Sequence, residues 1–191
     1  MSYPFLVAKR LYLRPLTEAD ADGPYPGWLN DERVCEGNAH HVFPYSREGA
    51  LAYIRHAQST RDELILAIVL KDGDRHIGNI ALQRLHPQFR SAEFAILIGD
   101  RSTWGKGYSK EAAALLCAHG FYTLNLHRIA CGTFASNVAM RRLAEYLGMR
   151  EEGVRRQAAF KDNAYVDLVE YGVLRSEFVE KFAHRPGREE D

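Results

Sequence analysis

The alternation of apolar and polar side chains predicts a strand near the start of the chain and a helix further along. Leu11 and Leu13 alternate with Tyr12 and Arg14, the period of two that a half-buried strand shows. After Ser46, a suitable helix N-cap, apolar residues recur at helical spacing as far as about residue 60. We therefore expect a first strand over residues 10–16, a loop-rich stretch and then an amphipathic helix.

Two further strands are predicted by the apolar run that follows. Residues 63–71 are almost entirely apolar and β-branched, and the turn residues Asp72, Gly73 and Asp74 separate them from residues 75–85. This order of apolar run, tight turn and second run is typical of an antiparallel hairpin.

In the second half of the chain, segments with the period of a strand alternate with segments with the period of a helix. We expect strands over 92–98 and 128–133, helices from about 108 to 124 and over 137–147, and a final hairpin of 154–160 with 165–174. The predicted fold class is α/β, with a mixed and mostly antiparallel sheet of six or seven strands and helices on both faces. One domain should span residues 1–183, and the polar residues 184–191 should form a disordered tail.

Composition narrows the classes of function. The chain has 191 residues, of which 46% are apolar, and its 25 basic and 25 acidic residues cancel. Such a balance gives no long-range field for nucleic acid or for an anionic membrane, so any anion site must be local. The three cysteines have no paired spacing, which argues against disulfides and zinc, and no run approaches the ~18 apolar residues of a membrane span. We expect a soluble, cytoplasmic protein without a bound metal.

A candidate anion site lies between the strand at 92–98 and the helix that follows it. Gly105, Lys106 and Gly107 would put free backbone N–H groups and the positive end of a helix dipole at one spot. A simple tight turn explains the same glycines about equally well. The spacing fits neither the P-loop nor the dinucleotide-binding pattern, so a different phosphate-bearing ligand is indicated.

The segment Ser102–Gly107 resembles the pyrophosphate loop of the GNAT superfamily of N-acetyltransferases, Gln/Arg-x-x-Gly-x-Gly/Ala, at both glycines, with Ser102 in place of Gln or Arg. The wider series of 93–99, 104–112, Ser136–Asn137 and 147–153 is similar to the ribosomal-protein-type branch of that superfamily. The resemblance covers about residues 8–176. It implies the GNAT fold, in which acetyl-CoA lies where two central strands splay apart.

The resemblance also implies a set of residues that bind the cofactor. Pantetheine would follow the backbone of residues 96–98, and pyrophosphate would lie on residues 103–109. Asn137 matches an asparagine that touches pantetheine in the family, although an N-cap role explains it equally well. The expected cofactor-binding residues are Ile96, Leu97, Ile98, Thr103, Trp104, Gly105, Lys106, Gly107, Tyr108, Ser109 and Asn137.

Acetylation of an amine requires a base, because an alkyl ammonium is neutral in only about one molecule in a few thousand at pH 7. Glu93 is the predicted base, since it is a charge in an otherwise apolar strand and matches a position where this branch often carries a carboxylate. An exposed residue at the strand entrance is the alternative. The tyrosine that many members use as general acid is replaced by Ala144, so no acid is assigned.

The acceptor is open at this point. Trp28, Asn30 and Glu32 resemble a segment frequent in members that acetylate amino sugars, so they are the candidate substrate-binding residues, with Trp28 as a core residue the alternative. The expected partner is a small-molecule amine, such as an amino sugar or a polyamine, or a peptide N-terminus. The alternatives are a ribosomal-protein or N-terminal acetyltransferase and a non-catalytic acyl-CoA sensor, and family resemblance suggests a homodimer.

Overall fold

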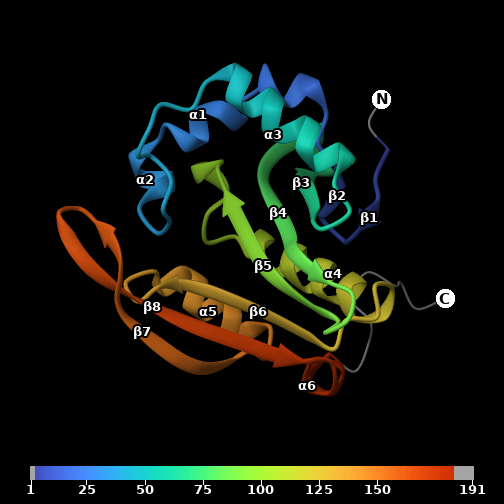
Figure 1. Ribbon diagram of the computed structural model, residues 1–191. Coiled ribbons are helices and arrows are strands. Elements are labelled where there is room, and N and C mark those ends of the chain that lie inside the picture. Colours follow the sequence, from blue (N-terminus) through green and yellow to red (C-terminus); the bar gives the residue numbers. More distant parts are fainter. Residues whose placement is uncertain (1–2, 183–191) are drawn as a thin grey trace.

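The computed structural model describes residues 3–182 and consists of one sheet with helices packed against both faces (Figure 1). The strands are β1 (Leu6–Val7), β2 (Leu11–Pro15), β3 (Leu64–Leu70), β4 (Arg75–His86), β5 (Ser91–Ile98), β6 (Arg128–Phe134), β7 (Arg150–Lys161) and β8 (Ala164–Leu174). The helices are α1 (Tyr25–Leu29), α2 (Glu32–Cys35), α3 (Arg47–Ser59), α4 (Tyr108–Tyr122), α5 (Val138–Tyr146) and α6 (Arg175–Lys181). Short 3-10 turns occur at Glu18–Ala21, Asp72–Asp74 and Arg101–Thr103.

The sheet has eight strands in the order β1-β2-β3-β4-β5-β6-β8-β7. Each strand is antiparallel to its neighbours except for β5 and β6, which are parallel. Parallel neighbours need a crossover connection, and α4 supplies it. The fold class predicted from the sequence is therefore confirmed, with one strand more than expected.

The extra strand is β1, whose two residues are too few to produce a periodic pattern. The short helices α1, α2 and α6 were also not predicted, because each has at most seven residues. The longer elements agree with the sequence analysis. Ser46 accepts a hydrogen bond from the Gly49 N–H at the start of α3, and α5 ends before Gly148. The tail predicted for residues 184–191 lies outside the described residues.

Each face of the sheet has its own apolar core. On one face, Ala92 and Phe94 of β5 pack with α4, α5 and α6 around the fully buried Phe121 and Phe178. On the other, residues of β2, β3 and β4 pack with α1, α2 and α3, and Leu97 of β5 joins this second core. Because neighbouring residues of β5 point to opposite faces, both cores constrain this strand.

The parallel pair β5–β6 creates a wedge in the sheet. The two strands pair only over Ser91–Glu93 and Arg128–Ala130. Beyond that point β5 stays with β4 as far as Ile98, whereas β6 stays with β8 as far as Phe134, so the strands diverge (Figure 1). Peptide groups on the inner edges of the wedge have no strand partner, and a ligand with amide groups can bind to them.

Candidate functional site

A pocket of about 850 Å³ occupies the wedge between β5 and β6. It is lined by β5 residues 94–98, by the loop and first turn of α4, by the start of α5, and by α1, α2 and the loop that follows α2. The pocket therefore has two ends. We call the end at the α4 loop the donor end and the end at α1 and α2 the acceptor end.

The donor end is made mainly of backbone. Gly105 and Gly107 have φ angles of 74° and 79°, in the left-handed region that side-chain-bearing residues avoid. Gly107 is the N-cap of α4 and offers no side-chain cap, so the first N–H groups of this 15-residue helix lack intrahelical partners. They open into the pocket at the positive end of the helix dipole, which suits a phosphate group.

Arg10, in the turn between β1 and β2, holds this loop in place. Its Nε donates to Glu111 of α4 at 2.6 Å, and its Nη1 donates to the carbonyl of Lys106 at 2.9 Å. The guanidinium also lies 4.5 Å from the centre of the Tyr108 ring. Arg10 was not predicted from the sequence, because it lies 96 positions from Lys106 and carries no motif of its own.

The structure gathers nearly all the predicted cofactor-binding residues in this pocket. Ile96, Leu97, Ile98, Thr103, Trp104, Gly105, Gly107, Tyr108, Ser109 and Asn137 all belong to its lining. Lys106 is the exception, because its side chain is not part of the lining and its carbonyl accepts from Arg10. Trp104 also closes the end of β5, since its indole N–H donates to the Ile98 carbonyl at 2.9 Å.

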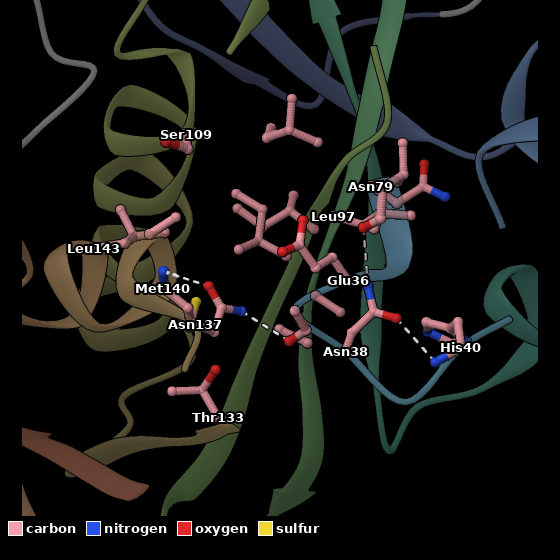
Figure 2. A pocket seen from close by; sticks show the side chains of 18 of the residues that line it. Glu36, Asn38, His40, Asn79, Leu97, Ser109, Thr133, Asn137, Met140 and Leu143 are labelled. Atoms are coloured by element: carbon pink, nitrogen blue, oxygen red, sulfur yellow. Dashed lines mark hydrogen bonds between the residues drawn. The ribbon is translucent and has the colours of Figure 1, made fainter. Parts of the chain in front are cut away.

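Asn137 connects the two ends of the pocket. Its Oδ1 accepts from the Met140 N–H at 3.0 Å, so it is the N-cap of α5, while its Nδ2 donates to the Gly37 carbonyl at 2.8 Å (Figure 2). Lys161 of β7 makes a second bridge, from Nζ to the Cys35 carbonyl at 3.1 Å. The C-terminal half of the molecule thereby holds α2 and its following loop against the pocket.

The acceptor end is made mainly of side chains from separate elements. Figure 2 shows Glu36 in the middle of the pocket, between Asn137 on one side and Asn38 and Asn79 on the other. Within residues 3–182, Glu36 is the only carboxylate of the lining and takes part in no recorded ion pair. The wall behind it is aromatic and aliphatic and consists of Tyr25, Leu29, Tyr45, Tyr53, Ile65 and Ala81.

The tyrosines of this wall are neutral phenols. Burial raises the pKa of Tyr25 and Tyr45, and it raises the pKa of Tyr53 to about 12. The hydroxyls of Tyr25 and Tyr45 lie 3.1 Å apart and share a hydrogen bond. Desolvation lowers the pKa of His40, another residue of the lining.

A buried polar network supports the wall from behind. Arg14 donates two hydrogen bonds to Asp20, at 2.7 and 2.6 Å, and His76 Nδ1 lies 3.4 Å from the same carboxylate. His76 Nε2 lies 2.8 Å from Oδ1 of Asn79, which lines the pocket. Since Nε2 also faces the Gly78 carbonyl, it carries a proton and fixes the orientation of the Asn79 amide.

Glu93, the predicted base, lies outside the lining of the pocket. Its carboxylate accepts from Arg84 at 2.7 Å, and its side chain is 48% exposed. Glu93 is the last β5 residue that pairs with β6, so it marks the closed end of the wedge. Its catalytic role stays a prediction.

The candidate acceptor residues Trp28, Asn30 and Glu32 also lie outside the lining. Trp28 is 7% exposed and packs so closely on Gly99 that a Cβ there would come within 1.9 Å of the indole, so it is a core residue. Asn30 bonds to the backbone N–H and carbonyl of Tyr45 and thereby positions that tyrosine. Glu32 is exposed in the first turn of α2.

The lining residues that sequence reasoning missed are next to the predicted ones. Asp31 caps α2 by accepting from the Arg33 and Val34 N–H groups, and Glu36 follows the end of that helix. Recognition of Asp31 as an N-cap would have placed a short helix here and drawn attention to Glu36.

Residues 3–182 contain neither a cluster suited to a metal ion nor a helix suited to a membrane. This part of the chain contains no group of three or more His, Cys, Asp or Glu residues arranged to hold a metal ion. Its helices are all too short or too polar to span a bilayer.

Comparisons with known proteins agree on one family. Residues 10–150 match the acetyltransferase (GNAT) domain family. The uncharacterized N-acetyltransferase YoaA of Bacillus subtilis is 28% identical over 176 residues, which cover 91% of this chain and 98% of YoaA. YdaF of the same organism, whose name proposes a ribosomal N-acetyltransferase, is 32% identical over 114 residues, covering 60% of this chain and 61% of YdaF.

The fold is also found among solved structures. The spermidine N-acetyltransferase of Vibrio cholerae, solved in complex with CoA and spermine, superposes with a TM-score of 0.79. The match covers 89% of this chain and 98% of that one at 24% sequence identity. At this identity the likeness demonstrates a shared fold.

Proposed function

The chain belongs to the acetyltransferase (GNAT) domain family and is an N-acetyltransferase, and we propose that it transfers acetyl from acetyl-CoA to a primary amine of a small molecule. The observation that carries the proposal is the wedge between β5 and β6, with the glycine loop of α4 at one end and Glu36 at the other. An anion-binding loop and an amine-binding carboxylate in one continuous pocket suit a reaction between a phosphate-bearing donor and an amine.

The residues of the donor end fit acetyl-CoA. The amides of Gly107, Tyr108 and Ser109 would bind the pyrophosphate, and the free edge of β5 at residues 96–98 would bind the pantetheine amides. When bound, acetyl-CoA supplies an acetyl group activated as a thioester. The residues of the chain must then bring an amine to that group, keep water away and remove protons from the amine.

The proton balance defines what the acceptor end must do. An ammonium that becomes an amide forms one N–C bond and loses two protons, while the C–S bond breaks; one proton ends on the thiol and the other is released. Removal of the first proton from an ordinary alkylammonium costs roughly 4–5 kcal/mol at pH 7, and a carboxylate in the pocket can accept that proton. We propose Glu36 for this role because it lines the pocket without an ion-pair partner among the described residues.

The proposal is tested by measuring acetyl-CoA binding and thiol release separately. We expect acetyl-CoA to raise the melting temperature, since a ligand of the native state stabilises it, and we expect a primary amine to release free CoA thiol. The alternative, a non-catalytic acyl-CoA sensor, is suggested by Ala144, which stands where many family members use a tyrosine as the general acid. Binding of acetyl-CoA with no thiol release from a wide panel of amines would favour that sensor over the enzyme.

The hypothesis that Glu93 is the base has its own test. If Glu93 is the base, the substitution Glu93→Gln should reduce kcat by about 10²- to 10⁴-fold. If Glu93 is only one half of an exposed ion pair with Arg84, Glu93→Gln should change kcat by less than about threefold. Arg84→Gln should then change kcat to a similar extent. Because Glu93 is not part of the pocket lining, we expect the second result; a kcat reduced 100-fold in Glu93→Gln but not in Arg84→Gln would restore Glu93 as the base.

A further inference from the structure

We propose that the acceptor is a primary amine with a single cationic centre and an apolar body, and that Glu36 binds its ammonium group. This inference rests on the proposed N-acetyltransferase reaction and goes further, because it selects one class of acceptor from the amino sugars, polyamines and peptide amines that the sequence left open.

The first argument for this acceptor class comes from the charged residues of the lining. In the described part of the chain, Glu36 is the only acidic residue of the lining and Arg33 is the only Lys or Arg. Glu170, next to Gly132 of the lining, is partnered by Arg155 at 3.5 Å. One ammonium can therefore find an unpaired carboxylate in the pocket, but a second ammonium would meet Arg33 or no counter-charge.

The apolar wall carries the second step. Apart from the polar side chains of Arg33, Glu36, Asn38, His40, Asn79 and Gln83, the acceptor end is formed by three tyrosines and by Leu29, Ile65 and Ala81. The Tyr25 ring contacts those of Tyr45 and Tyr53 at centroid distances of 5.8 and 6.3 Å, so the three rings form one packed surface. Such a surface gains free energy from contact with a hydrocarbon or aromatic body, and the hydroxyls of Tyr25 and Tyr45 are already bonded to each other rather than to a ligand.

The third argument for this acceptor class is that the backbone around Glu36 is held in place. Asp31 caps α2 on the side before it, and the backbone on both sides of it is held by Lys161 at Cys35 and by Asn137 at Gly37. The backbone at Glu36 is therefore held opposite α5 (Figure 2). An anchored backbone reduces the conformational entropy that is lost when an ammonium binds to the side chain.

A polyamine is disfavoured by the same features. Burial of a second ammonium in this pocket would remove its hydration without providing a carboxylate, which is costly for a charged group. The likeness to the spermine-bound Vibrio cholerae enzyme, at 24% identity, is a likeness of fold and does not by itself select a polyamine as the acceptor.

The experiment compares acceptors that differ in one property at a time. Initial rates of thiol release are measured with 2-phenylethylamine, spermidine, glucosamine and a short peptide with a free α-amine. Binding of 2-phenylethylamine and of its neutral analogue 2-phenylethanol is measured by calorimetry with CoA present. We expect 2-phenylethylamine to exceed spermidine at least tenfold in kcat/KM and to bind roughly 10- to 100-fold more tightly than 2-phenylethanol, the effect of one hydrogen-bonded charge.

Two variants assign the effect to Glu36. Glu36→Gln should remove the preference for the ammonium over the alcohol, whereas Glu48→Gln, which changes an exposed carboxylate in the first turn of α3 outside the lining, should keep it. An unchanged affinity of each variant for acetyl-CoA shows that it is folded. If Glu36→Gln does not fold, the comparison of the amine with the alcohol in the wild type still decides whether the pocket binds a cation more tightly than a neutral group of similar shape.

The outcomes separate the inference from the function on which it rests. Thiol release with spermidine, glucosamine or the peptide at a kcat/KM tenfold above that of 2-phenylethylamine would overturn the acceptor class and leave the acetyltransferase proposal standing. A Glu36→Gln variant that still prefers the ammonium would overturn the role of Glu36. Absence of thiol release with every amine would overturn the proposed function and this inference with it.

Discussion

The two ends of the pocket are built on opposite principles. The donor end consists of one continuous stretch, β5 followed by the loop and the first turn of α4, and its binding groups are backbone amides. The acceptor end consists of side chains from α1, α3, β3, β4 and the loop after α2, which are far apart in the sequence. Asn137 is the residue that bonds across the two, from the α5 N-cap to Gly37.

This difference determines which changes each end tolerates. A backbone site depends on φ angles that few residues can adopt, so it should be sensitive to glycine replacement and tolerant of side-chain truncation. A side-chain site depends on the packing and hydrogen bonds behind each group, so it should be sensitive to changes in its support. The predictions below test this contrast, from the largest expected effect to the smallest.

The largest effect is expected at Asp20, behind the acceptor end. Asp20→Asn leaves Arg14 buried without its counter-charge, and loss of one partner of a buried ion pair costs about 3–5 kcal/mol of unfolding free energy. Chemical denaturation measures this cost. A loss below about 1 kcal/mol would show that the network is not a support of the acceptor wall.

The pH dependence of that difference provides a control. Burial alone would raise the pKa of Asp20, but hydrogen bonds from Arg14 and the Thr17 N–H outweigh it and hold the pKa far below the usual value. A group whose pKa is lowered on folding stabilises the protein above its unfolded pKa of about 3.9 and loses that contribution as pH falls. The stability gap between wild type and Asp20→Asn should be constant above about pH 5 and should shrink below about pH 4.

The second effect concerns the donor end. Gly107→Val puts a β-branched residue at a φ of 79°, where it is strained, and places a side chain at the N-terminus of α4. We expect the Kd for acetyl-CoA to rise about 100-fold or more, because hydrogen bonds to a charged group are lost together. Gly153→Val is the matched control, since a Cβ there meets open space. An equal effect in both variants would contradict a specific role of the loop.

The contrast also explains what the sequence predicts well. A site made of backbone groups can be recognised in a short stretch of sequence, because the residues that allow its φ angles are adjacent in the chain. Gly105 and Gly107 stand between a long apolar strand and a long helix, so both the fold and the donor end follow from periodicity and spacing. Lys106 departs from this prediction, since it lies outside the lining and its carbonyl accepts a hydrogen bond from Arg10, a contact that the sequence does not show.

The acceptor end cannot be recognised from a short stretch of sequence in this way. Glu36 and Glu93 are both single charges near apolar residues, and the sequence alone does not show that one enters the pocket while the other pairs with Arg84. Trp28 lies on a helix of five residues, where one position decides between core and pocket. Side chains that meet through tertiary packing have no fixed spacing, so their identification required the arrangement of the strands and helices.

The smallest effect is expected at the connection between the two ends. Asn137→Ala removes the N-cap of α5, worth about 1 kcal/mol, and the hydrogen bond to Gly37, worth about 0.5–1.5 kcal/mol, and should lower the Tm by roughly 3–8 °C. Asn137→Asp keeps the cap oxygen but loses the donor, so it isolates the bond to Gly37. If that bond holds the loop with Glu36 in place, Asn137→Asp should raise KM for the amine more than KM for acetyl-CoA. Equal changes in the two KM values would mean that Asn137 acts at the donor end alone.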